Sequence, residues 1–172
     1  NKGLEMIEAR WLFDIPMSKV DVVVHPQSIV HSMVEFIDGS VLAQLSTTDM
    51  CFPIQYAVTW PERLSNELKP LDFPSLAKLE FEAPREDAFP ALRLSREAGE
   101  KGGTLPAVLN AANEVAVAAF LRRHVQFLEI SEIVSRVLDS YSPPEPTVLG
   151  DIFAIDEEAR MRAQQLVEDV TV

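Results

Sequence analysis

The sequence is short of cysteine, glycine and positive charge, and each shortage excludes a class of protein. A single cysteine, Cys51, excludes a disulfide within the chain, and no Cys/His cluster has the spacing of a zinc site. The six glycines are scattered, so there is neither a G-x-G-x-x-G motif nor a P-loop. With 15 basic and 27 acidic residues the net charge is −12, which argues against nucleic acid and anionic membranes as partners.

Long hydrophobic runs are missing as well. No apolar stretch reaches the ~20 residues of a membrane-spanning helix, and no segment has the pattern of a signal peptide. At 172 residues and 47% hydrophobic, the chain is still long and apolar enough for one sizeable domain or two small ones. Because the sequence lacks an initiator methionine and opens directly on a helical pattern, we expect it to be a fragment of a longer protein.

Residues 1–13 predict an amphipathic helix. Leu4, Ile7 and Trp11 recur at the spacing of one buried helix face, and Asn1 is a favoured N-cap type. We therefore expect the helix to start at Asn1 and to bury Trp11. Trp60 is likewise expected in the core.

The start of this helix is a candidate site. Asn1 and Glu5 lie one turn apart, about 6 Å along the axis. Free backbone N–H groups and Lys2 suit a phosphate, and Glu5 is a hard oxygen ligand for Mg²⁺ or Mn²⁺. Phosphate at the helix start and metal one turn further would fit a short sugar phosphate. The alternative is an ordinary capped helix with a solvated Glu5.

Strand signals follow. The β-branched run 20–24 predicts a buried strand, which His25-Pro26-Gln27 ends. Residues 29–36 and 40–45, separated by Asp38-Gly39, predict a β-hairpin. Both faces of this hairpin carry apolar residues, so we expect it to be covered on both sides or to pair with another chain.

The rest of the chain predicts helices. A short helix over 53–60 is bounded by Pro53 and Pro61. Prolines at 61, 70, 74 and 84 make 61–85 a linker, with one possible edge strand at 79–82. Further helices are predicted at 88–101, at 104–123 with Thr104 as its cap, at 131–141, and at 157–168 with Asp156 as its cap; Pro143-Pro144 breaks the chain between the last two. The fold class is α+β: an α+β part (1–60), a linker (61–85) and a small helical bundle (86–172).

Other polar residues have two interpretations each. Asn110, Asn113 and Glu114 share one side of the long helix, where they can hold an active-site loop or tie the bundle to the α+β part. His25 and His31 can be acid–base groups or hydrogen-bonded structural histidines.

Several linked motifs together resemble a known family. They are Asn1-Lys2-Gly3-Leu4-Glu5, His25-Pro26-Gln27-Ser28, His31-Ser32-Met33, Asp38-Gly39-Ser40 and Leu109-Asn110-Ala111-Ala112-Asn113-Glu114. In this order they resemble the 1-deoxy-D-xylulose 5-phosphate reductoisomerase family, and the resemblance covers essentially the whole chain. It corresponds to the later part of the family's sequence, without the N-terminal NADPH-binding domain and the first part of the catalytic domain.

The resemblance implies a fold and a reaction. The family forms V-shaped homodimers with a Rossmann-like NADPH domain, a connecting α/β catalytic domain and a C-terminal helical bundle. This chain would be a partial α/β catalytic domain with a β-hairpin, followed by the small bundle. The reaction is a divalent-metal-assisted isomerisation and NADPH-dependent reduction to 2-C-methyl-D-erythritol 4-phosphate, in the non-mevalonate isoprenoid pathway of bacterial cytoplasm or plastid stroma.

The resemblance also implies roles for residues. Glu5 would be the metal ligand (Mn²⁺ or Mg²⁺) and touch substrate, Asn1 and Lys2 would hold the substrate's hydroxyls and phosphate, and His31 would be a further substrate contact. Lys2 and Glu5 would thus be the catalytic residues. Met50 resembles a residue of the site wall.

The chain is not expected to act alone. One carboxylate cannot make a Mg²⁺ site, which needs several oxygens, and the family often has a basic residue where Cys51 stands. We expect the remaining ligands, and NADPH binding, to come from the missing domain, so that the chain alone is inactive. The alternatives are a non-catalytic dimerisation module of the same fold and a helical adaptor that binds a peptide.

Overall fold

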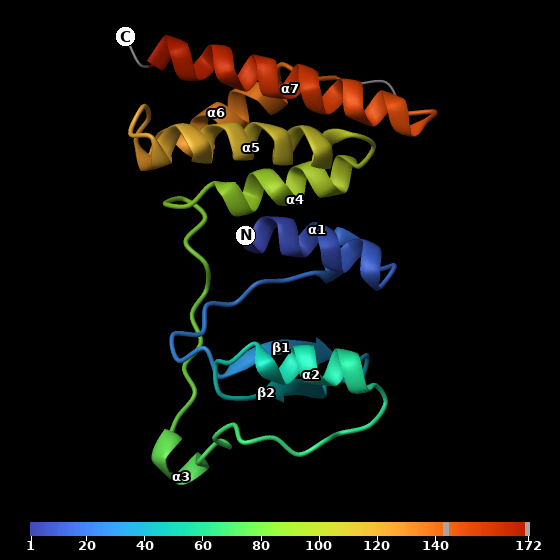
Figure 1. The fold of residues 1–172 in the computed structure, drawn as a ribbon, viewed down its shortest axis with the longest axis vertical. Coiled ribbons are helices and arrows are strands. Elements are labelled where there is room, and N and C mark those ends of the chain that lie inside the picture. The colour runs from blue at the N-terminus through green and yellow to red at the C-terminus, as the bar shows by residue number, and fades with distance from the viewer. Residues whose placement is uncertain (143–144, 171–172) are drawn as a thin grey trace. The chain divides into compact units, whose positions relative to one another are not determined.

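The computed structural model describes residues 1–142 and 145–170, so the predicted break at Pro143-Pro144 lies outside the described residues. The chain forms two compact units (Figure 1). The helical unit comprises Asn1–Val22 and Arg85–Val172, and the hairpin unit comprises Val23–Pro84. The α+β class is confirmed. Within the described residues, no helix is both long and apolar enough to cross a membrane.

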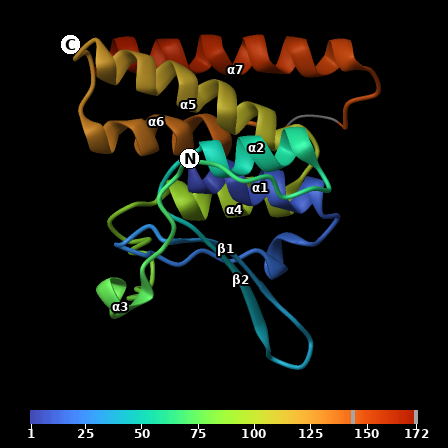
Figure 2. The same cartoon turned by 60° about the horizontal axis from the view of Figure 1, so that its bottom comes forward.

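The helical unit is a layered bundle centred on one long helix. Its elements are α1 (Lys2–Leu12), the 3-10 helix η1 (Met17–Lys19), α4 (Ala91–Lys101), α5 (Leu105–Leu121), α6 (Phe127–Asp139) and α7 (Leu149–Val170). α5 packs against α4, α6 and α7, and α1 lies along α4 (Figures 1 and 2).

Alanines let the central helices approach closely. Ala112 and Ala116 of α5 are fully buried, as are Ala159 and Ala163 of α7. The middle of α5 is therefore buried, whereas Leu105 and Phe120 near its two ends are only partly buried.

α1 belongs to the helical unit, although the sequence suggested that residues 1–60 would stand apart from the bundle. Met6 and Ile7 of α1 are buried in the same core as Leu94 and Ala98 of α4. The two units therefore differ from the expected division at 60 and 85. The reason is that α1 packs against α4, which lies some ninety positions later in the sequence. That division remains a prediction for the domains of the complete protein.

Both tryptophan predictions are wrong. Trp11 is 64% exposed and Trp60 is 70% exposed. The buried face of α1 runs through Gly3, Met6 and Ile7 instead, about one position round from the predicted stripe.

Two helices begin earlier than the sequence predicted, which was at residues 131 and 157. α6 starts at Phe127 because Gln126 and Glu129 form a capping box. α7 starts at Leu149, where the Asp151 carboxylate accepts hydrogen bonds from the backbone N–H of Thr147 (2.8 Å) and Val148 (3.1 Å). The prediction that Asp156 caps this helix is wrong.

The hairpin is the main feature of the second unit. Its elements are β1 (Val30–Glu35), β2 (Val41–Leu45), α2 (Cys51–Thr59) and the short α3 (Phe73–Leu76). The two strands are antiparallel, and Gly39 adopts a positive φ of 80° in the predicted turn. The hairpin prediction is confirmed.

Two further strand predictions fail. The run 20–24 forms no strand, and it contributes only Val24, which makes an isolated bridge with Glu82. The edge strand expected at 79–82 is reduced to the same bridge.

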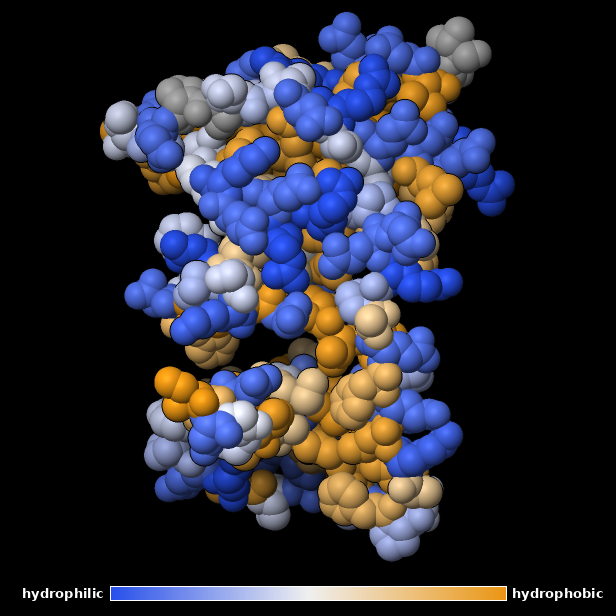
Figure 3. All heavy atoms as spheres, turned by 180° about the vertical axis from the view of Figure 1, so that it is seen from behind, coloured by the Kyte–Doolittle hydropathy of each residue, from blue (hydrophilic) through white to orange (hydrophobic). Residues whose placement is uncertain are grey.

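Much of the hairpin is exposed in the part of the chain that the structure describes. Every residue of β1 except Val30 is exposed. Apolar side chains lie at the surface of this unit (Figure 3). Those exposed on and between the strands are Met33, Val34, Phe36, Ile37, Val41 and Leu42. Of the two expectations for this hairpin, pairing with another chain stays open.

Candidate functional site

The first turn of α1 presents backbone and side-chain groups that the fold itself does not use. Glu5 N–H donates to the Asn1 carbonyl oxygen at 2.9 Å, so Asn1 occupies the N-cap position. The Asn1 side chain makes no capping hydrogen bond and is exposed. The N–H groups of the first turn point out of the helix start, where the helix dipole favours an anion.

Lys2 and Glu5 form an ion pair on this turn. The Lys2 ammonium donates to the Glu5 carboxylate, and their side chains are 67% and 47% exposed. The pair holds one positive and one negative group side by side at the surface. A metal ion would compete with Lys2 for Glu5, and a phosphate would compete with Glu5 for Lys2. The sequence therefore identified a pair that the structure does bring together.

The described residues do not form a metal site by themselves. Across residues 1–142 and 145–170 there is no group of three or more His, Cys, Asp or Glu side chains that could hold a metal ion. The exposed Glu5 carboxylate fits a Mg²⁺ or Mn²⁺ ion as one oxygen ligand of several.

His31 lies in the hairpin unit, at an irregularity in the sheet. Val30 pairs with Leu45 and Ser32 with Gln44, so His31 is an extra residue on β1, as in a β-bulge. Its Nε2 lies 3.3 Å from the Ser46 carbonyl oxygen. Because a carbonyl only accepts, Nε2 carries the proton and Nδ1 is left as an acceptor. No sequence signal indicated the bulge, which redirects this side chain.

His25 has a structural environment. Its Nδ1 donates to the Glu80 carbonyl oxygen at 2.7 Å, and its ring stacks on Phe81 at 4.8 Å between centroids. Its Nε2 is buried without a hydrogen-bond partner. These contacts favour the structural interpretation of His25.

The Asn110–Glu114 cluster acts inside the bundle. The Asn110 side chain donates to Glu114 at 3.2 Å, and Glu114 accepts from Arg160 of α7 at 2.8 Å. Arg160 also pairs with Asp156 at 2.7 Å, and the hydrogen bonds that Arg160 donates to the carboxylates of Asp156 and Glu114 raise the pKa of its guanidinium. The cluster thus ties α5 to α7, rather than the bundle to the α+β part.

Cys51 is unsuited to nucleophilic chemistry. Asp49 accepts a hydrogen bond from the Cys51 backbone N–H at 2.8 Å. The hydrogen bond between the thiol and this carboxylate raises the pKa of Cys51, which disfavours the thiolate. Met50, the neighbouring N-cap residue of α2, is 70% exposed.

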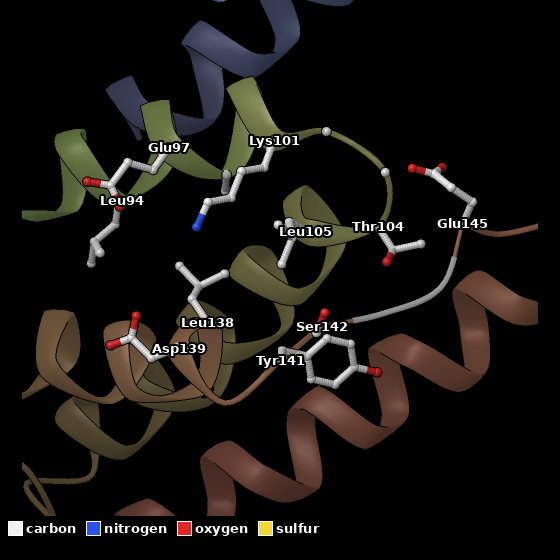
Figure 4. Close-up of a pocket in the computed structure, with 13 residues that line it drawn as sticks. Leu94, Glu97, Lys101, Thr104, Leu105, Leu138, Asp139, Tyr141, Ser142 and Glu145 are labelled. Carbon is white, nitrogen blue, oxygen red and sulfur yellow. The ribbon is translucent and has the colours of Figure 1, made fainter.

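A cavity of about 390 Å³ lies in the helical unit, beside the turn between α4 and α5. The Lys101 side chain points into it, and Glu97, Asp139 and Glu145 lie around it (Figure 4). Thr104 lines it too, with a buried hydroxyl that has no partner among the residues that the structure describes. One ammonium among three carboxylates favours no single ligand class, and no sequence motif pointed here.

Known proteins resemble the chain closely. A family model described as the DXP reductoisomerase C-terminal domain matches residues 45–162. The 1-deoxy-D-xylulose 5-phosphate reductoisomerase of Zymomonas mobilis is 52% identical over 170 residues, which cover 99% of this chain and 44% of that protein. The same enzyme of Pseudomonas putida is 56% identical over 164 residues, which cover 93% of this chain and 40% of that protein.

Solved structures agree. The Zymomonas mobilis enzyme in complex with NADPH superposes with a TM-score of 0.92 at 52% identity, over 98% of this chain and 44% of that one. A DOX-P reductoisomerase in complex with NADPH, fosmidomycin and magnesium gives a TM-score of 0.91 at 42% identity, over 98% of this chain and 43% of that one. The chain thus spans less than half the length of the relatives it matches.

Proposed function

The chain belongs to the DXP reductoisomerase family, and from this membership we propose that it supplies a metal ligand that also touches substrate, Glu5, and three further substrate contacts to a 1-deoxy-D-xylulose 5-phosphate reductoisomerase. The complete enzyme would use NADPH and a divalent metal to isomerise and reduce its sugar-phosphate substrate to 2-C-methyl-D-erythritol 4-phosphate. The observation that carries this proposal is the Lys2–Glu5 pair at the start of α1.

The two residues of the pair would bind different ligands. Glu5 donates a carboxylate oxygen to the metal, which when bound stabilises negative charge on substrate oxygens. Lys2 and the first backbone N–H groups of α1 bind the phosphate. The exposed Asn1 side-chain amide hydrogen-bonds a substrate hydroxyl. Substrate binding would separate Lys2 from Glu5. Lys2 would then pair with the phosphate and Glu5 with the metal, so neither charge would be left desolvated without a partner.

His31 would be the third substrate contact. With Nε2 held by the Ser46 carbonyl, Nδ1 is fixed as an acceptor for a hydroxyl proton. A β-bulge is a common device for redirecting a side chain beside an active site. The bulge and the contact with Ser46 support a binding role for His31.

The rest of the site is proposed to lie in the part of the complete protein that this chain does not span. Mg²⁺ prefers about six oxygen ligands, and no group of three candidate ligands exists among the described residues. Solved relatives carry NADPH and magnesium, which supports Mg²⁺ and NADPH here; Mn²⁺ is a second candidate because it accepts the same oxygen ligands.

The exposed apolar hairpin supports a homodimer in the complete enzyme. From the family, that enzyme would work in bacterial cytoplasm or plastid stroma. Six large apolar residues remain uncovered on and between its strands, namely Met33, Val34, Phe36, Ile37, Val41 and Leu42. A non-catalytic dimerisation module is the second candidate, favoured by this same surface, but such a module has no use for Lys2 or Glu5.

A metal titration of the complete enzyme tests the proposal. We expect Glu5→Gln to raise the Mg²⁺ concentration needed for half-maximal activity by about tenfold or more, since one charged ligand is lost. Glu8→Gln, at an exposed position of the same helix, is the matched control and should leave it unchanged. Lys2→Met should raise KM for the sugar phosphate. Wild-type metal dependence in Glu5→Gln would contradict the ligand assignment. NADPH-dependent turnover by the 172-residue chain alone would contradict the expectation that the chain is inactive without the rest of the protein.

A further inference from the structure

Gly3 lies between Lys2 and Glu5 and is buried against Ser95 of α4. A Cβ atom added at Gly3 would lie 2.5 Å from Ser95 Cβ and would overlap the Ser95 hydroxyl. The first turn of α1 can approach α4 this closely only because residue 3 has no side chain.

Ser95 is itself held in place. Its hydroxyl donates to the Ala91 carbonyl oxygen at 2.9 Å, and the residue is only 5% exposed. Its neighbours Leu94 and Ala98 are buried in the bundle core. The surface that Gly3 meets is therefore a rigid part of the bundle.

A second contact fixes the rotation of α1 about its axis. A Cβ added at Gly99, one turn after Ser95, would lie 3.2 Å from Ile7 Cγ1 and 2.8 Å from Met17 Cε. Gly3 and Ile7 thus pin α1 to α4 at two successive points. With both points fixed, the direction in which Asn1, Lys2 and Glu5 project is fixed as well.

We propose that Gly3 and Ser95 are positioning residues, whose close contact sets where the ligand groups of α1 stand. The inference rests on the proposed function, because it matters only if Asn1, Lys2 and Glu5 bind metal and substrate. It assigns a role to the C-terminal bundle: α4 carries no ligand and acts through α1. A side chain at position 3 must push the first turn away from α4, and a displacement of about 1 Å at a reacting site can cost about a hundredfold in rate.

The test perturbs the contact from each side in the complete enzyme. Gly3→Ala adds a methyl group on α1, and Ser95→Thr adds one on α4 while keeping the hydroxyl. Each should lower kcat/KM by about 10- to 100-fold and raise the Mg²⁺ concentration for half-maximal activity.

The double variant Gly3→Ala/Ser95→Gly adds a methyl group on α1 and removes the facing side chain on α4. The nearest remaining atom would then be the Ala91 carbonyl oxygen at 3.4 Å, an ordinary contact. We expect this double variant to recover most of the lost activity and metal affinity, a rescue that a general loss of stability would not produce.

Val137→Ala is the stability control. Val137 is fully buried in α6, so its truncation creates a cavity and should lower the thermal midpoint. It should leave KM and metal dependence unchanged, because it does not touch α1.

These variants distinguish a failure of the positioning role from a failure of the proposed function. Wild-type kinetics in a folded Gly3→Ala or Ser95→Thr enzyme would overturn the positioning role even where Glu5→Gln has lost metal affinity. If Gly3→Ala does not fold, Ser95→Thr and the double variant decide: a double variant that folds but stays impaired overturns the inference. Unchanged metal dependence in Glu5→Gln would instead refute the proposed function itself.

Discussion

Gln27 and Glu80 exchange two hydrogen bonds across 53 residues of the hairpin unit. Gln27 Nε2 donates to the Glu80 carboxylate at 2.8 Å, and the Glu80 backbone N–H donates to Gln27 Oε1 at 3.2 Å. His25 adds a bond to the Glu80 carbonyl oxygen, and Val24 pairs with Glu82. This clasp, formed by residues 24–27 and 80–82, closes the unit just before the segment that leads into β1.

A charge change at Gln27 tests the clasp. Gln27→Glu would place two carboxylates face to face and should lower the free energy of unfolding by about 1 kcal/mol or more. Glu80→Gln keeps an amide acceptor opposite Gln27 and should cost less. The pair Gln27→Glu/Glu80→Gln reverses the donor and the acceptor, so stability should return. Urea denaturation measures all three, and a double variant no better than Gln27→Glu would refute the pairing.

Thr104 should tolerate loss of its hydroxyl. It occupies the N-cap position of α5 as the sequence predicted, but its side chain makes no cap hydrogen bond, and its buried Oγ1 has no partner among residues 1–142 and 145–170. Thr104→Val keeps the shape and removes the unpaired polar atom, so we expect unchanged or higher stability, by up to about 1 kcal/mol. Thr104→Ser, which keeps the hydroxyl and loses a methyl group, should be less stable than wild type. A clear loss in Thr104→Val would indicate a capping bond.

Arg160 is expected to stabilise the contact between α5 and α7. It bonds both Asp156 on its own helix and Glu114 on α5. Because its side chain is 37% exposed, solvent screens both pairs, and Arg160→Met should cost only about 1 kcal/mol. Arg93→Met is the control, since Arg93 pairs only with Glu97 along one helix and should cost about 0.5 kcal/mol or less. Urea denaturation at low and at high salt measures both, and the difference should shrink in high salt.

Glu158 should make stability depend on pH in the acid range. Hydrogen bonds from the Tyr141 hydroxyl and then from Arg162 lower the pKa of Glu158 below its ordinary 4.5. The folded state therefore binds this proton less tightly than the unfolded state, so the stabilisation is present above the ordinary value and is lost as the pH falls through the lowered one.

The variant Glu158→Gln should flatten that part of the pH profile. The measurement is the urea midpoint from neutral pH down to about pH 3. Glu157→Gln, at the exposed neighbouring position of α7, should keep the wild-type slope. Equal slopes in Glu158→Gln and wild type would show that Glu158 does not contribute.

Local chemistry made much of this protein predictable. The Asp38-Gly39 turn, the alternation on both sides of it and the 3.6-residue period of the long helix all act within a few residues, and the hairpin and α5 followed from them. The pairing of Lys2 with Glu5 is equally local, because residues three apart on a helix are neighbours whatever else the chain does.

Other features depended on contacts that no local pattern contains. The start of α1 is buried at Gly3 because Ser95 lies against it, so the helix faces its partner on a different side from the one its Trp11 suggested. The run 20–24 has strand composition, yet beyond Val24 it finds no ladder partner within the described chain and stays irregular.

The sequence by itself determined which residues form the hairpin and the central helices, and which charged groups share the first turn of α1. Only the tertiary structure decided that this turn belongs to the helical bundle and that His31 sits at a bulge. The physical reason is range: helix and turn preferences come from residues within about four positions. The choice of a packing partner depends on shape at positions such as 3 and 95, which only the folded chain brings together.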